Sequence, residues 1–480
     1  MKINRHIIRG YDIRGIVDED LNPEIVKNIG ASYGTYMQKK YPDLKKVVIG
    51  YDSRLTSEEY HNLVADGIAS TGLSVIDIGL TMVGTVYWAQ YYFKTQAAVM
   101  VTASHNPAEY NGFKMAIDFS ESMIGKELND VVDLAEKPDE FIVAEKFGEI
   151  EKNDVRDVYF ADIMERVKIN RKFKVVVDAS CTTPGVIVPD LLRRVGCEVI
   201  ESNCELDGTF PLGVADPTEL IVAERLRDKV LETGSDIGFS YDTDGDRIGI
   251  VDGKGTIIWN DVLVALLAID ILKEHPGEKI MYNTLCSKVV DDAIVANGGV
   301  PFMWRTGHGF LKKKNQEVKA PFIGELSGHF FFSADFYNHD DGCYVTLRLL
   351  SYLAKTNQTL NEAISSLTKY ISSPEIKLAC DDDKKVELMD KVVLILTKDF
   401  PEAEIISDER AGDGVRLELE DGMFVFRYSQ NGPYTTVKFE AKAQDKYDYL
   451  KKYLNKLLHS FEEINWDKSV GVNVNVESLE

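Results

Sequence analysis

Three short apolar runs, each rich in β-branched residues, recur along the chain at intervals of roughly 100 residues. They are KKVVIGYDSR from Lys45, KFKVVVDASCT from Lys172 and EKIMYNTLCSK from Glu278. Each run ends in small or polar residues and leads into a helical pattern. Continuous apolar strands that alternate with helices are typical of mainly parallel sheets covered on both faces. The sequence therefore predicts three related α/β domains with mixed sheets, produced by duplication.

The C-terminal part of the chain has a different pattern. Apolar and polar residues alternate around Asp421-Gly422, a dipeptide suited to a tight hairpin turn. Leucine and aromatic residues then follow at helical spacing from Tyr449 to Phe461. We expect a smaller α+β domain here, ending in a loosely held polar tail from Trp466. The predicted domains are 1–152, 153–254, 255–370 and 371–480.

Charge and composition limit the classes of partner. The 480 residues include 55 basic and 78 acidic side chains, a formal net charge of −23, which argues against nucleic acid or an anionic membrane as partner. A small anionic substrate stays possible, because salt screens distant charges over roughly 8 Å. The six cysteines form no CxxC pair, and we find neither a membrane-spanning stretch nor a signal-peptide core. We expect a cytoplasmic protein with reduced thiols.

The segment DTDGDR carries the strongest chemical signal. Asp242, Asp244 and Asp246 alternate along the chain, and a curled loop permitted by Gly245 would bring their carboxylates to one hard cation such as Mg²⁺. The positions that follow do not fit a calcium-binding helix-loop-helix. An acidic surface turn is the alternative, but Arg247 beside the acids is typical of an anion clamp.

The loop TASHNP follows a predicted strand over residues 97–101 and presents Ser104 at a sheet edge, where ligands of α/β folds usually bind. Its flanking residues do not match the G-x-S-x-G motif of an acyl-transfer serine. We do not expect His105 to act as the base of Ser104, since neighbouring side chains on an extended chain point apart. A helix-capping serine remains the alternative.

Two further loops carry candidate binding groups. In GELSGH, the side chains of Glu325, Ser327 and His329 would point the same way on an extended loop, an arrangement suited to adjacent sugar hydroxyls. His308 lies in a second glycine-flanked loop. Either histidine could instead be a structural residue, and the following lysines, 312–314, resemble a solvated face.

The segment FRYSQNGP offers many hydrogen-bond donors and almost no negative charge, which suits a phosphate dianion. A polar loop after a hairpin is the alternative. Its candidate phosphate-binding residues are Arg427, Ser429, Gln430, Asn431 and Gly432. The chain has no Walker-type or G-x-G-x-x-G motif, so the sequence gives no support for nucleotide binding.

Taken in order, YDIRG from Tyr11, TASHNP, DTDGDR, GELSGH and the late phosphate loop resemble the α-D-phosphohexomutase family, in its phosphomannomutase/phosphoglucomutase branch. The resemblance spans nearly the whole chain. It implies a heart-shaped enzyme of four domains, each with one motif facing a central cleft. The phosphate loop departs from the family's common R-x-S-N-T-x-P pattern at Gln430 and Asn431.

The resemblance also implies a mechanism. Phosphorylated Ser104 would bind Mg²⁺ together with the three aspartates and exchange its phosphoryl group with a hexose phosphate, through a hexose 1,6-bisphosphate. Arg14, Lys114 and Arg247 would balance charge, His329 would be the general base, and His308 an assistant. Tyr11 and Lys288 would lie near the substrate, Glu325 and Ser327 would bind sugar hydroxyls, and the late loop would bind the non-reacting phosphate.

The partners implied are small sugar phosphates, and we expect a monomer or weak dimer. The sequence leaves the preferred sugar open between mannose, glucose and glucosamine phosphates. A phosphoglucosamine mutase is therefore the nearest alternative. A non-catalytic sugar-phosphate sensor and a Mg²⁺-dependent phosphatase are alternatives from other classes.

Overall fold

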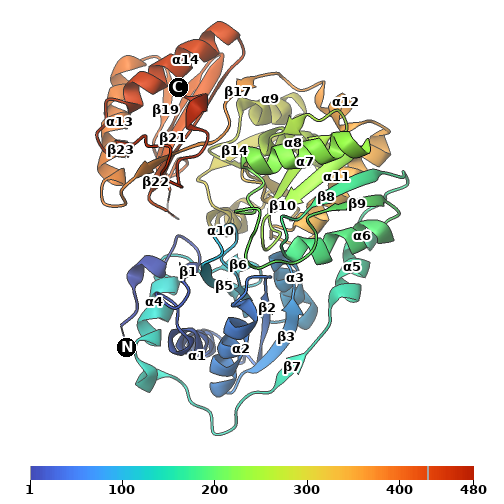
Figure 1. Cartoon of the computed structure of the whole chain (residues 1–480), viewed down its shortest axis with the longest axis vertical. Helices are drawn as coiled ribbons and strands as arrows, with labels where there is room; N and C mark the ends of the chain where they lie inside the picture. The colour runs from blue at the N-terminus through green and yellow to red at the C-terminus, as the bar shows by residue number, and fades with distance from the viewer. Residues whose placement is uncertain (1, 430–431) are drawn as a thin grey trace.

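The computed structural model describes residues 2–429 and 432–480, so Gln430 and Asn431 of the predicted phosphate loop lie outside the described residues. The described chain forms four successive sheets with flanking helices (Figure 1). In this view the first sheet and its helices, in blue, lie below the second and third, in green to yellow, and the C-terminal domain, in orange and red, lies at the upper left. The α/β class with a sheet-rich fourth domain is as predicted.

The first sheet has the strand order β1-β5-β4-β2-β3-β7, with β6 beside β5. Its strands are β1 Ile13–Ile16, β2 Lys46–Tyr51, β3 Ser74–Leu80, β4 Ala98–Val101, β5 Tyr110–Asp118, β6 Glu121–Ser122 and β7 Ile150–Lys152. Its helices are η1 Arg5–Ile7, α1 Pro23–Lys40, α2 Ser57–Ser70, α3 Val83–Phe93, α4 Lys126–Ala135 and η2 Pro138–Glu140.

The second sheet has the order β12-β11-β10-β8-β9. Its strands are β8 Lys174–Asp178, β9 Glu198–Ser202, β10 Ile237–Tyr241, β11 Ile248–Asp252 and β12 Ile257–Ile258, and its helices are α5 Arg156–Glu165, η3 Thr183–Val186, α6 Val188–Arg194 and α7 Leu220–Thr233. Strand β12 extends this sheet slightly past the proposed boundary at residue 254. The division at 152, 254 and 370 remains our proposal.

The third sheet has the order β14-β13-β15-β16. Its strands are β13 Lys279–Asn283, β14 Val300–Trp304, β15 Phe322–Gly324 and β16 Phe330–Phe331, and its helices are α8 Asn260–Glu274, α9 Lys288–Ala296, α10 His308–Val318, α11 Gly342–Thr356 and α12 Leu360–Ile364.

The three predicted apolar runs are strands β2, β8 and β13, and they hold equivalent places. Each pairs in parallel with two neighbours: β2 with β3 and β4, β8 with β9 and β10, and β13 with β14 and β15. In each sheet, one of these two neighbours is followed along the chain by an antiparallel partner strand. These pairs are β4 with β5, β10 with β11, and β15 with β16. The same unit therefore occurs three times, as duplication predicts.

The C-terminal sheet is antiparallel throughout, in the order β19-β20-β21-β22-β18-β23, with β17 beside β22. Its strands are β17 Ile371–Ser372, β18 Ile376–Cys380, β19 Glu404–Ile406, β20 Gly414–Leu419, β21 Gly422–Tyr428, β22 Tyr434–Ala441 and β23 Ile464–Asn465. Its helices are α13 Lys385–Asp399, α14 Gln444–Leu458 and η4 Val476–Ser478. Helices α13 and α14 cover its apolar face.

Two local predictions in this domain were wrong. Leu419 pairs with Gly422, so the hairpin turn is Glu420-Asp421, one residue earlier than predicted. The tail is not loosely held: Val474 bridges to Lys377, and Leu479 is fully buried in the domain core. A few buried apolar side chains suffice to dock a polar tail, because burying one leucine or valine side chain contributes about 1.5–3 kcal/mol.

The first three domains pack together closely. One apolar cluster joins α3 and β4 of the first domain to the cores of the second and third. The C-terminal domain has its own cluster, and among its described residues only Met423 and Val425 join the large one. Among the described helices, none combines the length and the apolar character needed to cross a membrane.

Candidate active site

The three predicted motifs occupy the same loop in the three repeated units. TASHNP connects β4 to β5, DTDGDR connects β10 to β11, and the residues after Gly324 connect β15 to β16. Because the units are equivalent, duplication places all three loops at corresponding sheet ends. A cavity where they meet is lined by residues of all four domains. The predicted site residues in its lining are Tyr11, Arg247, His308, Glu325, Ser327, His329, Arg427 and Ser429.

The three aspartates of the second loop converge as expected. Oxygen atoms of Asp242, Asp244 and Asp246 lie within 4.8 Å of one another, and all three residues are buried. Gly245 has a φ of 70°, which lets the loop curl. The Oδ1 atoms of Asp244 and Asp246 are buried without a hydrogen-bond partner among the described residues. This oxygen cluster fits a hard divalent cation such as Mg²⁺.

Lys114 on β5 balances part of this negative charge. Its Nζ lies 2.8 Å from Asp244 Oδ2 and 2.5 Å from Asp246 Oδ2. Burial alone would lower the pKa of Lys114, but these carboxylates outweigh it and raise the pKa well above its usual value. Burial, together with the other two carboxylates, raises the pKa of Asp242 well above its usual value.

Ser104 reaches across from the first domain to the aspartate loop. Its Oγ donates a hydrogen bond of 2.8 Å to Asp242 Oδ2. Its φ of 49° lies in the left-handed region, so the backbone here is not extended. His105 Nδ1 consequently lies 3.3 Å from Ser104 Oγ, and our premise that the two side chains point apart was wrong. Burial, reinforced by Arg247, lowers the pKa of His105 well below its usual value.

Two arginines hold the Ser104 loop in place. Arg14 donates to Asp12, to the Ala103 carbonyl and to Asn106 Oδ1, the last at 2.6 Å. Arg54 donates to the carbonyls of Ser104 and Asn106, each at 2.6 Å. We did not predict a role for Arg54, although it ends the apolar run KKVVIGYDSR, where a site residue of an α/β fold is expected.

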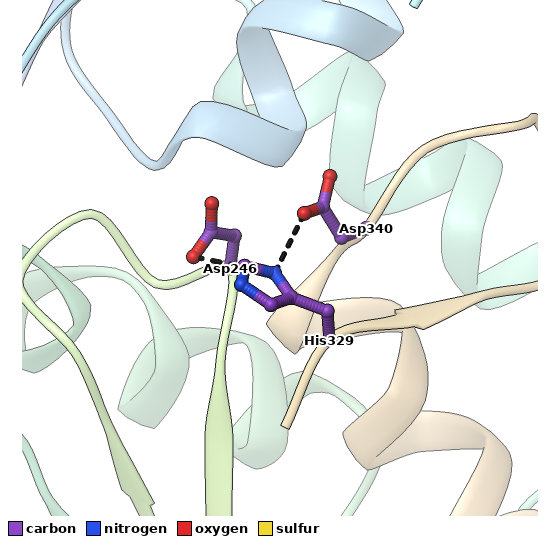
Figure 2. Close-up of side chains that lie close together, drawn as sticks. All are labelled: Asp246, His329 and Asp340. Carbon is purple, nitrogen blue, oxygen red and sulfur yellow. Dashed lines mark ion pairs between the residues drawn. The ribbon is translucent and has the colours of Figure 1, made fainter. Parts of the chain in front are cut away.

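Figure 2 shows His329 between two carboxylates from different domains. Its Nδ1 lies 2.7 Å from Asp340 Oδ2 and 3.7 Å from Asp246 Oδ1, and its Nε2 accepts a hydrogen bond of 3.0 Å from Arg247 Nε. A proton on Nδ1 facing Asp340 leaves the lone pair on Nε2, where it accepts the hydrogen bond from Arg247.

His308 stacks on His329, with ring centroids 4.9 Å apart, and its Nδ1 lies 3.4 Å from Asp340. Lys312 Nζ lies 2.9 Å from the same carboxylate. Burial alone would raise the pKa of Asp340, but Lys312 and His308 hold it well below its usual value. Lys312 is completely buried, so its assignment to a solvated face was wrong. The buried residues of α10 all lie in its first two turns.

The GELSGH segment is a tight turn and not the extended loop that we predicted. Gly328 N donates to the Glu325 carbonyl, and Glu325 N donates to the His329 carbonyl. The φ of 97° at Gly328 closes the turn. Glu325, Ser327 and His329 still all reach the cavity, because the turn itself projects into it. Burial raises the pKa of Glu325.

The C-terminal domain closes the cavity from the other side. Arg427 makes a two-pronged ion pair with Asp413, at 3.0 and 2.6 Å. Lys385 donates to the carbonyls of Ser429 and Gly432, which fixes the two ends of the predicted phosphate loop.

Lys288 is not brought to this cavity. Its Nζ pairs with Glu418 at 2.6 Å, and it lines a different cavity near the joint between the third and C-terminal domains. Conversely, His105, Asp216, Lys377 and Tyr434 line the site cavity without having been predicted. Of these, only His105 lies inside a motif that we singled out.

Comparison with known proteins identifies the family. A phosphomannomutase/phosphoglucomutase of Pseudomonas putida is 35% identical over 445 residues, which cover 93% of this chain and 94% of the relative. This chain belongs to the phosphoglucomutase/phosphomannomutase family. Residues 5–140, 157–255 and 259–370 match the family's alpha/beta/alpha domains I, II and III.

Solved structures share the family fold. A phosphoglucomutase/phosphomannomutase family protein of Burkholderia thailandensis superposes with a TM-score of 0.84 at 30% identity, over 96% of this chain and 98% of that one. An N-acetylphosphoglucosamine mutase of Aspergillus fumigatus, solved with glucose 1,6-bisphosphate, has a TM-score of 0.60 at 14% identity over 94% of this chain and 95% of that one, a likeness of fold alone.

Proposed function

We propose that this protein is a phosphohexomutase that interconverts the 1-phosphate and 6-phosphate of mannose or glucose, with Ser104 as the phosphoryl carrier. One observation supports the role of Ser104 most directly. Its hydroxyl lies 2.8 Å from Asp242, in a buried carboxylate cluster suited to Mg²⁺, and 3.3 Å from His105, which lines the cavity. A serine that only caps a helix would need none of these groups.

The reaction consists of two phosphoryl transfers. In the first, the bond between phosphorus and Ser104 Oγ breaks and a bond forms to the free hydroxyl oxygen of the hexose phosphate. His329 Nε2 takes the hydroxyl proton once Arg247 has moved its guanidinium from this nitrogen to the phosphoryl oxygens, and a 1,6-bisphosphate results. The bisphosphate then turns over in the cavity and returns its other phosphoryl group to Ser104, while the proton goes back to the product hydroxyl.

Catalysis of such a transfer rests on positioning and charge stabilisation. Lys114 and Arg247 lie beside the aspartate loop and would neutralise charge on the transferring group, and Arg14 fixes the Ser104 loop. Bound Mg²⁺, held by the three aspartates and Ser104, would supply further neutralisation of the phosphoryl oxygens.

Substrate binding falls to the other side of the cavity. Glu325 and Ser327 are suited to sugar hydroxyls, and Tyr11 packs edge-on against His308 beside them. Arg427 and Ser429 are suited to the phosphate that does not react. We propose that Gln430, Asn431 and Gly432 complete that phosphate site.

The test is a coupled isomerisation assay of wild type and Ser104→Ala with mannose 1-phosphate, glucose 1-phosphate and glucosamine 1-phosphate, each with Mg²⁺ and the matching bisphosphate. We expect the wild type to convert the mannose or glucose ester and Ser104→Ala to lose at least about 10³-fold in kcat. Ser407→Ala, at an exposed position, is the matched control.

Three outcomes would contradict the proposal. Preference for the glucosamine ester would identify a phosphoglucosamine mutase. Release of inorganic phosphate as fast as isomerisation would indicate a phosphatase. Binding without conversion by a folded wild type would indicate a sensor.

A further inference from the structure

The polar face of the C-terminal sheet carries a second cation beside Arg427. Lys377 on β18 and Arg427 on β21 pair with the same residue, Thr436, on the strand between them. Residues in one row across antiparallel strands project from the same face, and two strand spacings separate their backbones by roughly 10 Å. The long side chains of Lys377 and Arg427 both reach the site cavity, while the opposite face is apolar and covered by helices.

Lys377 is held there by a carboxylate from the second domain. Its Nζ lies 3.7 Å from Asp216 Oδ2, and the Lys377 side chain is only 13% exposed. Its Nζ also lies 5.9 Å from the ring centroid of Tyr434. Burial alone would lower the pKa of Lys377, but Asp216 outweighs it and raises the pKa above its usual value. Lys377 is therefore a largely buried side chain whose ammonium group faces a carboxylate.

The contact between Asp216 and its cations is loose. Asp216 Oδ1 accepts hydrogen bonds from Thr218 N and Oγ1, at 3.0 and 2.7 Å, so the carboxylate is anchored in its own domain. Its Oδ2 lies 3.7 Å from Lys377 and 3.8 Å from Arg247 Nη1. Charge-assisted hydrogen bonds measure roughly 2.7–2.9 Å. Both cations can therefore gain a closer contact with an incoming phosphate oxygen.

We propose that Lys377 binds the non-transferred phosphate of the substrate together with Arg427, and that Asp216 is the counter-ion that Lys377 leaves when this phosphate arrives. The inference rests on the proposed function and adds a binding residue to it. Asp216 balances the charges of Lys377 and Arg247 when no substrate is present. The phosphate takes over that role for Lys377, so its binding also draws Lys377 away from the second domain.

The first experiment compares Lys377→Met with wild type in steady-state kinetics, and in calorimetric titration with mannose 6-phosphate and glucose 6-phosphate. We expect Kd and KM to rise at least tenfold and kcat to change less than threefold. Lys377→Arg, which keeps the charge, should stay within threefold of wild type in Kd. Lys384→Met is the matched control, because Lys384 is half-exposed and pairs only with nearby Asp381 among the described residues.

Unchanged Kd in Lys377→Met, or a fall in kcat without a rise in Kd, overturns the inference. If Lys377→Met does not fold, Asp216→Asn provides the decision: without its competing carboxylate, the affinity for the sugar phosphate should increase two- to tenfold, and weaker binding overturns the inference. A wild type that binds these esters but does not isomerise them contradicts the proposed function alone.

Discussion

At the aspartate loop and at the C-terminal sheet, charged side chains from different domains meet in different ways. Lys114 of the first domain contacts Asp244 and Asp246 of the second at 2.8 and 2.5 Å. Lys377 of the C-terminal domain comes only within 3.7 Å of its partner in the second domain, Asp216. The first contact has the length of a strong charge-assisted hydrogen bond and the second does not.

In the proposed reaction, this difference matches two different tasks. Phosphoryl transfer needs charges fixed before the reaction begins, since reorganisation would cost part of the stabilisation. A phosphate site that takes the substrate in two orientations must instead gain and release its ligand. We therefore expect substitutions around the aspartate loop to affect folding stability and kcat. Substitutions on the polar face of the C-terminal sheet should affect KM.

The largest expected effect is at the aspartate loop. Asp244→Asn removes one of the three proposed cation ligands, and we expect kcat to fall by about 10³-fold. Chelation of the wild type should abolish activity, and added Mg²⁺ should restore it. Asp228→Asn, on the exposed surface of α7, should behave as wild type. Full activity of Asp244→Asn after chelation and return of Mg²⁺ would show that the metal lies elsewhere.

A substitution at Lys312 tests whether buried charges stabilise the fold around the aspartate loop. Lys312→Met leaves Asp340 without its ammonium partner, and we expect the free energy of unfolding in urea to fall by about 3–5 kcal/mol. Lys313→Met, at the half-exposed neighbouring position, should stay within about 0.5 kcal/mol of wild type. An equal loss of unfolding free energy in Lys312→Met and Lys313→Met would contradict a stabilising role for the buried charge pair.

Asp341 provides a pH-dependent test in the same interior. Burial, partly offset by hydrogen bonds from Tyr344 N and Tyr159, raises its pKa to about 6. Because the folded pKa lies above the unfolded value, this contribution to stability is fully present below about pH 4 and is lost as the pH rises through 6.

Asp341→Asn does not ionise and escapes that loss. Between pH 4 and 7.5, its unfolding free energy should therefore improve relative to wild type by about 2–3 kcal/mol. The measurement is urea unfolding at four pH values. Parallel pH curves for the two proteins would mean that Asp341 carries no charge-burial cost.

The smallest expected effect lies at the C-terminal face. Arg427→Met should raise KM by about tenfold to thirtyfold, equivalent to about 1.4–2 kcal/mol for one charge-assisted contact, with little change in kcat. Because the variant also leaves buried Asp413 without its partner, its folding is checked first. Arg410→Met, in the same domain but outside the site cavity, is the control. A large fall in kcat would mean that the two regions do not divide their tasks as we propose.

The predictable features are those that repeat along the chain. The three β-branched runs are the central strands of three equivalent units, and the serine and aspartate motifs occupy corresponding loops. Gly245 could be assigned its role because three closely spaced carboxylates meet only in a curled backbone. The Glu325 turn was harder, because alternation of polar residues suits both an extended loop and a hairpin.

Partners that come from distant segments could not be predicted. Asp340 and Lys312 have no motif of their own, and the lysine run around Lys312 resembles a surface. Lys377 stands in an ordinary strand, and Asp216 lies 161 residues earlier in a polar loop. Their pairing depends on how the C-terminal domain sits against the second.

The sequence by itself determined the repeated α/β units, one hairpin and one helix of the last domain, and the loops that meet at the cavity, because these follow from local periodicity and turn residues. Only the tertiary structure decided which charges are neutralised by which partners. Ser104 meets Asp242 across 138 residues of chain, and Lys377 meets Asp216 across two domains. The physical reason is that the strength of a charge contact depends on distance and burial, which domain packing sets and local sequence does not.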